Sequence, residues 1–498
     1  MSNATTSTSQ TTGTPSGPVD TAPDASVARL WITRAIIVAA VVIPIVLIFA
    51  IKGREATGGM AIVLMFVLML LRIPVAFALA IPGLIGIYAL SGSIAFENVM
   101  KGVPMGSAAQ WALSVIPMFV LMGLMLGYSG VTTQMYLTAR NWLSWLPGGL
   151  AIGTNLAGTG LAAVSGSTIG TTYALARVGI PEMFKAGYKP RLAIGSVIVA
   201  GLPGQLIPPS IFLVIVAGLL ENPVGPQLIA GVIPGLSVAL MFSIMIIVYS
   251  LIFPKWAGRG PGAVKPVITW GERWSSLSKV WPVVALIVLV FGGMFAGFFT
   301  ATEAGAAGAL GAIILLLIFQ RKNKPFKHLV NGALETVTSV GVIFFMLAGA
   351  TIFGSLIAVS GIGRLLADVI AEFNLDRVTF LILIMIIYIL LGMFMDPLAI
   401  LLTTIPIVVP VLEPLGIDPL WFGVFAVFMG EFAILTPPVG MLSFIIHKIV
   451  QDPTISLGQS ISLGEVFKAV MTFLPMGLVI TILWIAFPQI ITWLPSAM

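Results

Sequence analysis

The chain has 498 residues, of which 58% are hydrophobic and only 8% are charged. Soluble domains carry about 25% charged residues, so this composition excludes a soluble protein and predicts one that crosses a membrane many times. The formal charge of +6 does not indicate nucleic-acid binding, because the lysines and arginines lie in short loops, where they report topology. The chain has no cysteine, which excludes disulfides and thiol chemistry.

The sequence divides into a tail, one additional helix and two long halves. Residues 1–28 are rich in Ser, Thr, Pro, Ala and Gly, which predicts a disordered cytoplasmic tail. Residues 29–58 are built on one apolar segment and are predicted to form an extra N-terminal transmembrane helix. Two repeats are expected over residues 59–257 and 281–498, joined by a basic cytoplasmic connector over residues 258–280.

In the first half, residues 147–183 are too rich in Gly and Ser to be one ordinary membrane span. They predict a helical hairpin that enters and leaves on one side, with its tip near Ser165–Thr168. Residues 190–220 follow as a helix that is broken near Gly204–Ser210. Helix-breaking sequence at membrane depth leaves backbone groups unpaired, which is tolerated only around a cavity or a bound ion.

The second half repeats this plan, with a hairpin over residues 377–412 and a broken helix over residues 417–447. Its hairpin tip is Met395–Pro397, and its break is Leu435–Gly440. Ser167 precedes Pro208 by 41 positions, Asp396 precedes Pro437 by 41, and the second pair lies 229 positions after the first. Matched breaks in two halves of a membrane protein are typical of the binding site of a secondary transporter.

The topology follows from counting crossings and basic residues. We expect eleven crossings and two hairpins, with five crossings in each half, so the halves should be inverted relative to each other. With the N-terminus in the cytoplasm and the C-terminus outside, only 5 of the 24 lysines and arginines fall outside. The positive-inside rule therefore selects this orientation.

The two breaks offer oxygen ligands for a sodium ion and exposed helix starts for an anionic solute. The candidate sodium ligands are Ser165, Ser167, Gly204, Met395, Asp396, Thr436 and Gly440. The candidate residues for the solute are Ser165, Gly166, Ser167, Thr168, Pro208, Pro209, Ser210, Pro437 and Pro438. The alternative is that these Gly and Pro residues merely kink helices and allow close packing.

Several polar residues leave two interpretations open. Asp396 either coordinates an ion or caps the helix that begins at Pro397. Glu303 either belongs to a functional site or lies in water at the end of a segment. Glu431 is either a structural hydrogen-bond acceptor or a proton-coupled group. Arg177 either attracts an anion or extends to the cytoplasmic surface.

No motif for an enzyme is present: there is no Gly-x-Ser-x-Gly, His-Glu-x-x-His, phosphate loop or dinucleotide fingerprint. His328 and His447 have no partner histidine in the sequence pattern, so we expect no histidine metal site. Without a nucleotide-binding module, transport would be driven by an ion gradient, and Na⁺ is the predicted coupling ion.

Many short motifs, in order, resemble the large membrane subunit of tripartite ATP-independent periplasmic (TRAP) transporters. They are Arg72–Leu79, Ser165–Thr168, Ile180–Met183, Leu206–Ser210, Ile229–Leu236, Gly392–Pro397, Gly416–Pro419 and Leu435–Gly440. The resemblance covers about Gly59 to Pro495. Two departures are a first tip that reads Ser-Gly-Ser-Thr rather than Ser-Gly-Ser-Ser, and an N-terminal segment too short to hold a fused small subunit.

The resemblance implies an all-α polytopic protein of the bacterial inner membrane, in which two hairpins and two broken helices slide as an elevator. It implies Na⁺-coupled uptake of an organic acid, such as a C4-dicarboxylate or a sugar acid. The implied partners are a periplasmic substrate-binding protein and a separate small four-helix membrane subunit. The alternative is a stand-alone Na⁺/dicarboxylate transporter that needs no binding protein.

Overall fold

A computed structural model describes residues 25–258, 268–437 and 440–497, and these residues form 22 α-helices and three short 3₁₀ turns. Seven of the helices are long and apolar enough to cross a membrane. The predicted all-helical polytopic architecture is therefore confirmed. Most of the predicted N-terminal tail, part of the connector and Pro438 lie outside the described residues.

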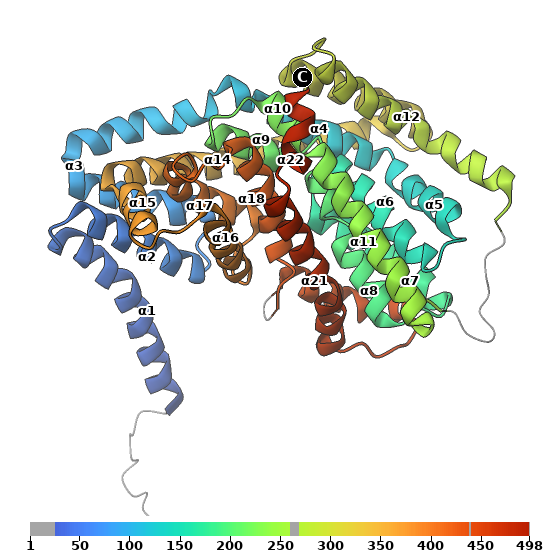
Figure 1. Ribbon diagram of the computed structural model, residues 1–498, viewed down its shortest axis with the longest axis horizontal. Helices are drawn as coiled ribbons and strands as arrows, with labels where there is room; N and C mark the ends of the chain where they lie inside the picture. Colours follow the sequence, from blue (N-terminus) through green and yellow to red (C-terminus); the bar gives the residue numbers. More distant parts are fainter. Residues whose placement is uncertain (1–24, 259–267, 438–439, 498) are drawn as a thin grey trace, which may run out of the picture.

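The first three helices lie on one side of the molecule, whereas α4 lies near the middle and α5 on the opposite side (Figure 1). Their bounds are α1 Ala25–Ala50, α2 Arg54–Leu70, α3 Val75–Ala108, α4 Val115–Tyr128 and α5 Val131–Leu143. Helix α1 extends away from the body, and most of its side chains are exposed. Residues 92–110 are less apolar than the segments around them, which predicts a position at the membrane interface. Helix α3 instead continues through a kink at Gly92, where φ is 78°, so most of this segment is the second arm of the same helix.

The middle of the chain holds the first hairpin and the first broken helix. The helices are α6 Gly149–Ser165, α7 Thr168–Lys185, α8 Pro190–Val199, α9 Ile211–Leu219, α10 Val224–Ala230 and α11 Val232–Ile252. Proline at the first helical position starts α8, as the fixed φ of proline suits that position. The sequence pattern did not anticipate that α10 and α11 are separate helices.

The second half begins with α12 Trp270–Phe295, α13 Ala301–Phe319, α14 Pro325–Ser360 and α15 Ile362–Glu372. The sequence predicts an interfacial helix over residues 328–340 and a separate crossing over Gly341–Val359, but helix α14 runs without interruption for 36 residues and contains both. The chain then forms α16 Arg377–Gly392, α17 Pro397–Leu412, α18 Pro419–Ala433, α19 Met441–Val450, α20 Pro453–Ser456, α21 Leu463–Ala486 and α22 Gln489–Ser496.

The helices from α2 to α11 recur in the same order as α12 to α21. From α6 onward, each helix begins 228 to 231 positions before its counterpart. The packing is reciprocal: α3 packs along α14 while α4 packs along α13, and α5 contacts α12 while α2 contacts α15. Figure 1 shows α3 beside α14 on one side of the molecule. Each half therefore supplies the packing partners of the other half.

Candidate functional site

The first hairpin turns at Gly166 and Ser167. Gly166 ends α6 with a φ of 63°, a left-handed conformation that glycine adopts without strain. The hydroxyl of Ser167 then caps α7 by accepting a hydrogen bond from the Gly170 amide at 3.1 Å. The Ser165 hydroxyl accepts from the Ser167 amide at 3.3 Å and lies 3.2 Å from the Thr171 hydroxyl. The small and hydroxyl-bearing residues thus close a tight turn.

The second hairpin turns between Gly392 and Pro397. Asp396 caps α17, because its Oδ1 accepts a hydrogen bond from the Ala399 amide at 3.1 Å, and Pro397 takes the first helical position. Asp396 therefore has the same structural role as Ser167, 229 positions earlier. Among the described residues, its second oxygen, Oδ2, accepts no hydrogen bond. The cap thus leaves one carboxylate oxygen for another partner.

The first broken helix is interrupted between Val199 and Ile211 by a 3₁₀ turn over Pro203–Gln205. The buried Ser210 hydroxyl restarts the helix by accepting from the Leu213 amide at 3.1 Å. Pro208 and Pro209, immediately before this cap, are also buried. The predicted polar residue of this break is therefore already engaged by the backbone.

The second broken helix is interrupted between Ala433 and Met441. Backbone hydrogen bonds hold the described part of the loop; among them, the Thr436 amide donates to Ala433 at 3.0 Å, and the Gly440 amide donates to Thr436 at 3.1 Å. Gly440 has a φ of 32°. Pro437 is half-buried, whereas the predicted Pro438 lies outside the described residues.

Each hairpin tip packs, at equivalent positions, on the broken helix of its own half. A Cβ added at Gly201 would lie 3.2 Å from the Thr168 Cα, and one added at Gly430 would lie 3.7 Å from the Pro397 Cα. Gly430 and Pro397 are each 229 positions after Gly201 and Thr168. The Gly201 backbone therefore lies tight against the first tip, whereas the contact between Gly430 and the second tip has an ordinary van der Waals length.

A second close contact is also repeated, but its glycine changes sides. A Cβ added at Gly204, in the first break, would lie 2.4 Å from the Ala162 Cβ on α6. In the second half the glycine is Gly392, on the hairpin, and an added Cβ would lie 2.2 Å from the Ala433 Cβ. Position 392 matches Ala163 and position 433 matches Gly204. In both halves the hairpin and the broken helix therefore approach each other closely at this point, although the glycine that allows the approach lies on a different one of the two segments.

Several buried polar atoms on these segments have no hydrogen-bond partner within the described part of the chain. They are Oγ1 of Thr168, Thr172, Thr403 and Thr436, Oγ of Ser443, both amide atoms of Gln205, and Oε2 of Glu431. Buried polar groups in proteins are almost always paired, since leaving one unpaired costs about 1–3 kcal/mol. These atoms are therefore available to a ligand. Gln205 was not a predicted site residue, although its position between Gly204 and Leu206 in the break was a signal.

Glu431 lies where the two halves meet. The residue is 2% exposed, and its carboxyl interacts electrostatically with the Thr168 hydroxyl of the first tip and the Asp396 carboxyl of the second. Among the described residues, no lysine, arginine or histidine forms an ion pair with Glu431 or Asp396. Two acidic groups without a basic partner require a cation or a proton nearby.

The remaining acidic candidate, Glu303, is not part of this arrangement. It is exposed, and its Oε2 accepts from the Thr300 amide at 2.8 Å in a capping box that starts α13. This supports the interpretation of Glu303 as a hydrated segment end.

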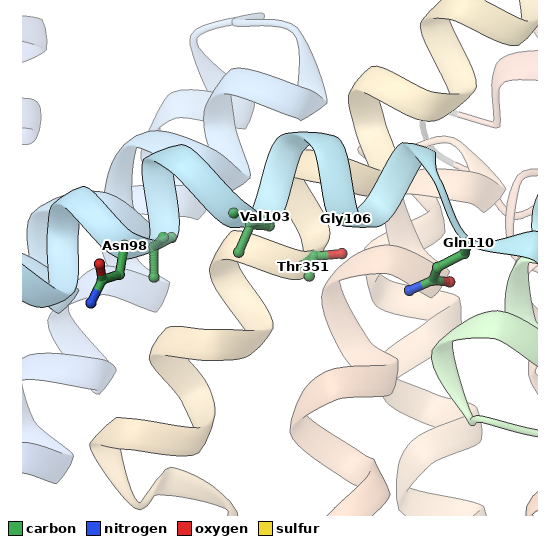
Figure 2. Close-up of a pocket in the computed structure, with 7 residues that line it drawn as sticks. Asn98, Val103, Gly106, Gln110 and Thr351 are labelled. Carbon is green, nitrogen blue, oxygen red and sulfur yellow. The ribbon is translucent and has the colours of Figure 1, made fainter.

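Two cavities lie near these elements. One, of about 460 Å³, lies beneath the second arm of α3, between Asn98 and Gln110, with Thr351 of α14 on its floor (Figure 2). It includes no residue of the tips or breaks. The other, of about 580 Å³, begins at Ile169 and Gly170, directly after the first tip, and includes Arg177. The second cavity is therefore the one that adjoins the candidate site.

Comparison with known proteins identifies relatives over most of the chain. The family described as "Tripartite ATP-independent periplasmic transporter, DctM component" matches residues 62–490. The C4-dicarboxylate TRAP transporter large permease protein DctM of Vibrio cholerae is 28% identical over 88% of this chain and 98% of its own. The sialic acid TRAP transporter permease SiaT of Haemophilus influenzae is 28% identical, over 90% and 69%. The ectoine TRAP transporter large permease TeaC of Halomonas elongata is 28% identical, over 86% and 96%.

A solved structure supports the fold. The YdaH transporter of Alcanivorax borkumensis superposes with a TM-score of 0.57 at 16% sequence identity, over 82% of this chain and 91% of that one. At this identity the likeness concerns the fold alone.

Proposed function

The chain belongs to the DctM family of TRAP transporter large permeases, a family of transporters and not of enzymes, and we propose that it carries an organic acid into the cell together with Na⁺. The observation that supports this most directly is the meeting of both tips at Glu431. The buried carboxyl has an unpaired oxygen, interacts electrostatically with Asp396 and Thr168, and has no basic partner among the described residues. A sodium ion would satisfy these oxygens and offset their charge.

The ligands of the ion come from both halves. Asp396 Oδ2 and the hydroxyls at the first tip and second break supply side-chain oxygens, and the unwound backbone between α18 and α19 supplies carbonyls. Ser165, Ser167, Gly204, Met395, Thr436 and Gly440 remain the proposed sodium ligands, with Glu431 as a further group that faces the ion.

The solute would bind between the tips, where α7, α9, α17 and α19 begin. Helix starts present amide groups and a partial positive charge, which suit a carboxylate. Ser165–Thr168, Pro208–Ser210 and Pro437–Pro438 are the proposed contacts. The relatives are named for a C4-dicarboxylate, sialic acid and ectoine, so an organic acid is proposed as a class rather than as one compound.

We further propose that the two halves are inverted in the membrane and that the hairpins and broken helices move as one elevator body. The reciprocal packing of the halves supports this, because such pairing follows from a two-fold relation between them. The proposed location is the bacterial inner membrane, with the N-terminus in the cytoplasm and the C-terminus in the periplasm. The proposed partners are a periplasmic binding protein and a small four-helix subunit, because the chain belongs to a three-component family.

The test of this function is reconstituted uptake. The chain, its small subunit and its binding protein are placed in proteoliposomes, and uptake of labelled organic acids is measured with and without an inward Na⁺ gradient. We expect uptake only with the gradient and only with the binding protein. Uptake that needs Na⁺ but no binding protein would favour the stand-alone transporter instead.

Glu431→Gln tests the role of the buried carboxyl separately from uptake. Na⁺ should raise the melting temperature of the purified chain, since a ligand that binds the folded state stabilises it. We expect the Gln variant to fold but to lose most of this Na⁺-dependent rise. Glu303→Gln is the matched control, because its side chain is exposed and Gln also completes a capping box. An unchanged Na⁺ response in Glu431→Gln would remove this carboxyl from the site.

A further inference from the structure

The cavity beside the first tip is a groove between α7 on one side and α19 and α20 on the other. We call it the α7–α19 groove; its main lining residues are Ile169, Gly170, Tyr173, Arg177, Lys448 and Asp452. We call the end of the groove at Ile169, one residue after Thr168, its upper end, and the end at Arg177 its lower end. These ends are about 12 Å apart at 1.5 Å per helical residue. The groove thus leads from the candidate site toward one surface of the protein.

The groove carries excess positive charge. The Arg177 guanidinium stacks on the Tyr173 ring at 4.6 Å, which holds it along the groove wall. Among the described residues, neither Arg177 nor Lys448 forms an ion pair. Two cations therefore line a cavity with one acidic residue, Asp452.

Asp452 is committed to its own helix. Its Oδ1 accepts from the amide and hydroxyl of Thr454, at 2.9 and 2.7 Å, and so caps α20. These hydrogen bonds, with a smaller effect of Arg177, hold the pKa of Asp452 below its usual value. The carboxylate therefore does not form a direct ion pair that would neutralise the two cations.

The equivalent position of each of these residues in the opposite half carries no charge. Tyr173 corresponds to Leu402, Arg177 to Pro406, and Lys448 to Gly218 of the first half. The charge is therefore not part of the repeated architecture. It was added to one side of the candidate site.

We propose that the α7–α19 groove is an anion-binding exit site, in which Arg177 and Lys448 hold the carboxylate of the solute as it leaves the first tip. This inference rests on the proposed function, and the proposed orientation places the lower end of the groove toward the cytoplasm. Arginine binds carboxylates through two parallel hydrogen bonds, and its stacked plane is already positioned for this. Lysine adds a second, mobile charge at the end of the path.

The absence of cysteine from the chain allows a direct test. Ile169 lines the groove and is 37% exposed, so Ile169→Cys places one thiol beside the first tip. The full chain is placed in nanodiscs of phosphatidylcholine, which leave both faces accessible. Labelling rates are measured with a methanethiosulfonate that carries a sulfonate and with one that carries a trimethylammonium group. Their ratio reports local charge and cancels differences in access.

We expect the anionic reagent to react faster. Arg177→Gln and Lys448→Gln should each lower the ratio about two- to fourfold, as expected for one charge at about 10 Å in salt solution. Arg191→Gln is the matched control, because Arg191 also stacks on an aromatic ring, that of Trp256 at 5.4 Å, but lies outside the groove. A ratio that neither groove substitution changes would overturn the proposal.

A second set of labelling measurements distinguishes binding of a solute from binding of a lipid headgroup. Succinate at millimolar concentration should slow labelling by the anionic reagent in the parent chain and have less effect in Arg177→Gln. If nanodiscs of phosphatidylglycerol lower the ratio and succinate does not slow labelling, the groove binds lipid and the exit-site proposal is wrong. None of these measurements needs an ion gradient, so a failure of Na⁺-driven uptake would be recognised separately.

Discussion

Helices α7 and α17 hold equivalent positions after the two hairpin tips, yet their surroundings differ. The first nine residues of α17, from Pro397 to Ile405, are all buried. Helix α7 exposes a stripe at helical spacing, which consists of Ile169, Gly170, Tyr173, Ala174, Arg177 and Val178. One side of the candidate site is therefore open to a cavity, while the other is closed by packing. Within the described residues, the two-fold pattern of helices thus gives the two tips different surroundings.

The comparison also separates what the repeat conserves from what it varies. Caps, close backbone approaches and the order of helices recur in both halves. Charge does not recur: Ser167 becomes Asp396, Leu202 becomes Glu431, and Arg177 becomes Pro406. The second half supplies carboxylates for a cation, and the first supplies hydroxyls and an exit path. Substitutions that interchange features of the halves can test this division.

The largest expected effect comes from closing the clearance between Gly392 and Ala433. Gly392→Ala would place a Cβ 2.2 Å from the Ala433 Cβ, so the hairpin must move, at a cost of about 3 kcal/mol. The melting temperature and the monodisperse fraction should both fall. Gly341→Ala is the control, since an added Cβ there meets no atom within 4 Å.

A double substitution tests whether the stability lost in Gly392→Ala comes from the contact between residues 392 and 433. Gly392→Ala combined with Ala433→Gly recreates the arrangement of the first half, where Ala163 and Gly204 occupy these positions. We expect part of the stability to return; backbone atoms of Ala433 also lie close to the added Cβ, at 2.5 Å, so recovery should be incomplete. No recovery at all would show that the two contacts are not equivalent.

The next effect concerns the charge at the second tip. Asp396→Asn should keep the cap on α17, because asparagine caps helices as well as aspartate does. It should raise the Na⁺ concentration for half-maximal uptake about tenfold, equivalent to about 1.4 kcal/mol of lost ion binding. Unchanged sodium stimulation would leave Asp396 with a structural role only.

A smaller effect is expected at the equivalent residue of the first tip. Ser167→Ala removes the cap on the Gly170 amide and should cost about 1 kcal/mol of stability, read as a lower melting temperature. Ser167→Asp would give the first tip the residue of the second and should keep the cap. If Ser167→Ala is as stable as the parent, the cap contributes nothing measurable.

The smallest effect concerns the start of the second hairpin. Hydrogen bonds from Thr379, and the Val378 amide, hold the pKa of the exposed Asp376 below its usual value, whereas the first hairpin starts at Gly148 without a carboxylate. Since the folded-state pKa is depressed, the stabilisation is present above the unfolded pKa of about 4 and is lost as pH falls through the folded value. Amide exchange at the start of α16 should therefore increase below about pH 4 more than at the start of α6. Asp376→Ala should remove this difference.

The breaks could be predicted from sequence because Gly and Pro act locally. Residues 377–412 were expected to form a hairpin, and α16 and α17 span those residues. Helices α5 and α15 were missed because Val131–Leu143 is too polar, and Ile362–Glu372 too short, to resemble a membrane span. The 36 residues of α14 were divided because a charged segment precedes an apolar one, although helix geometry does not require a break there.

Contacts between the halves were beyond sequence reasoning. Glu431 was noted as an acidic residue in an apolar segment, but nothing in its neighbourhood indicated that it faces Thr168, 263 positions earlier. Gln205 and Ser443 were missed for the same reason: their lack of hydrogen-bond partners depends on which helices surround them. Spacing located the breaks, whereas the packing of one half against the other decided which side chains meet.

The reciprocal pairing of helices constrains how the protein is made. Helix α4 begins 186 residues before its partner α13, and α3 begins 250 residues before its partner α14. At about 5 to 20 residues per second, the nascent first half remains without these neighbours for roughly 10 to 40 seconds. Insertion must therefore hold an incomplete bundle in the bilayer until synthesis of the second half is well advanced. Truncation after the connector should yield a fragment that the cell degrades rather than a smaller working unit.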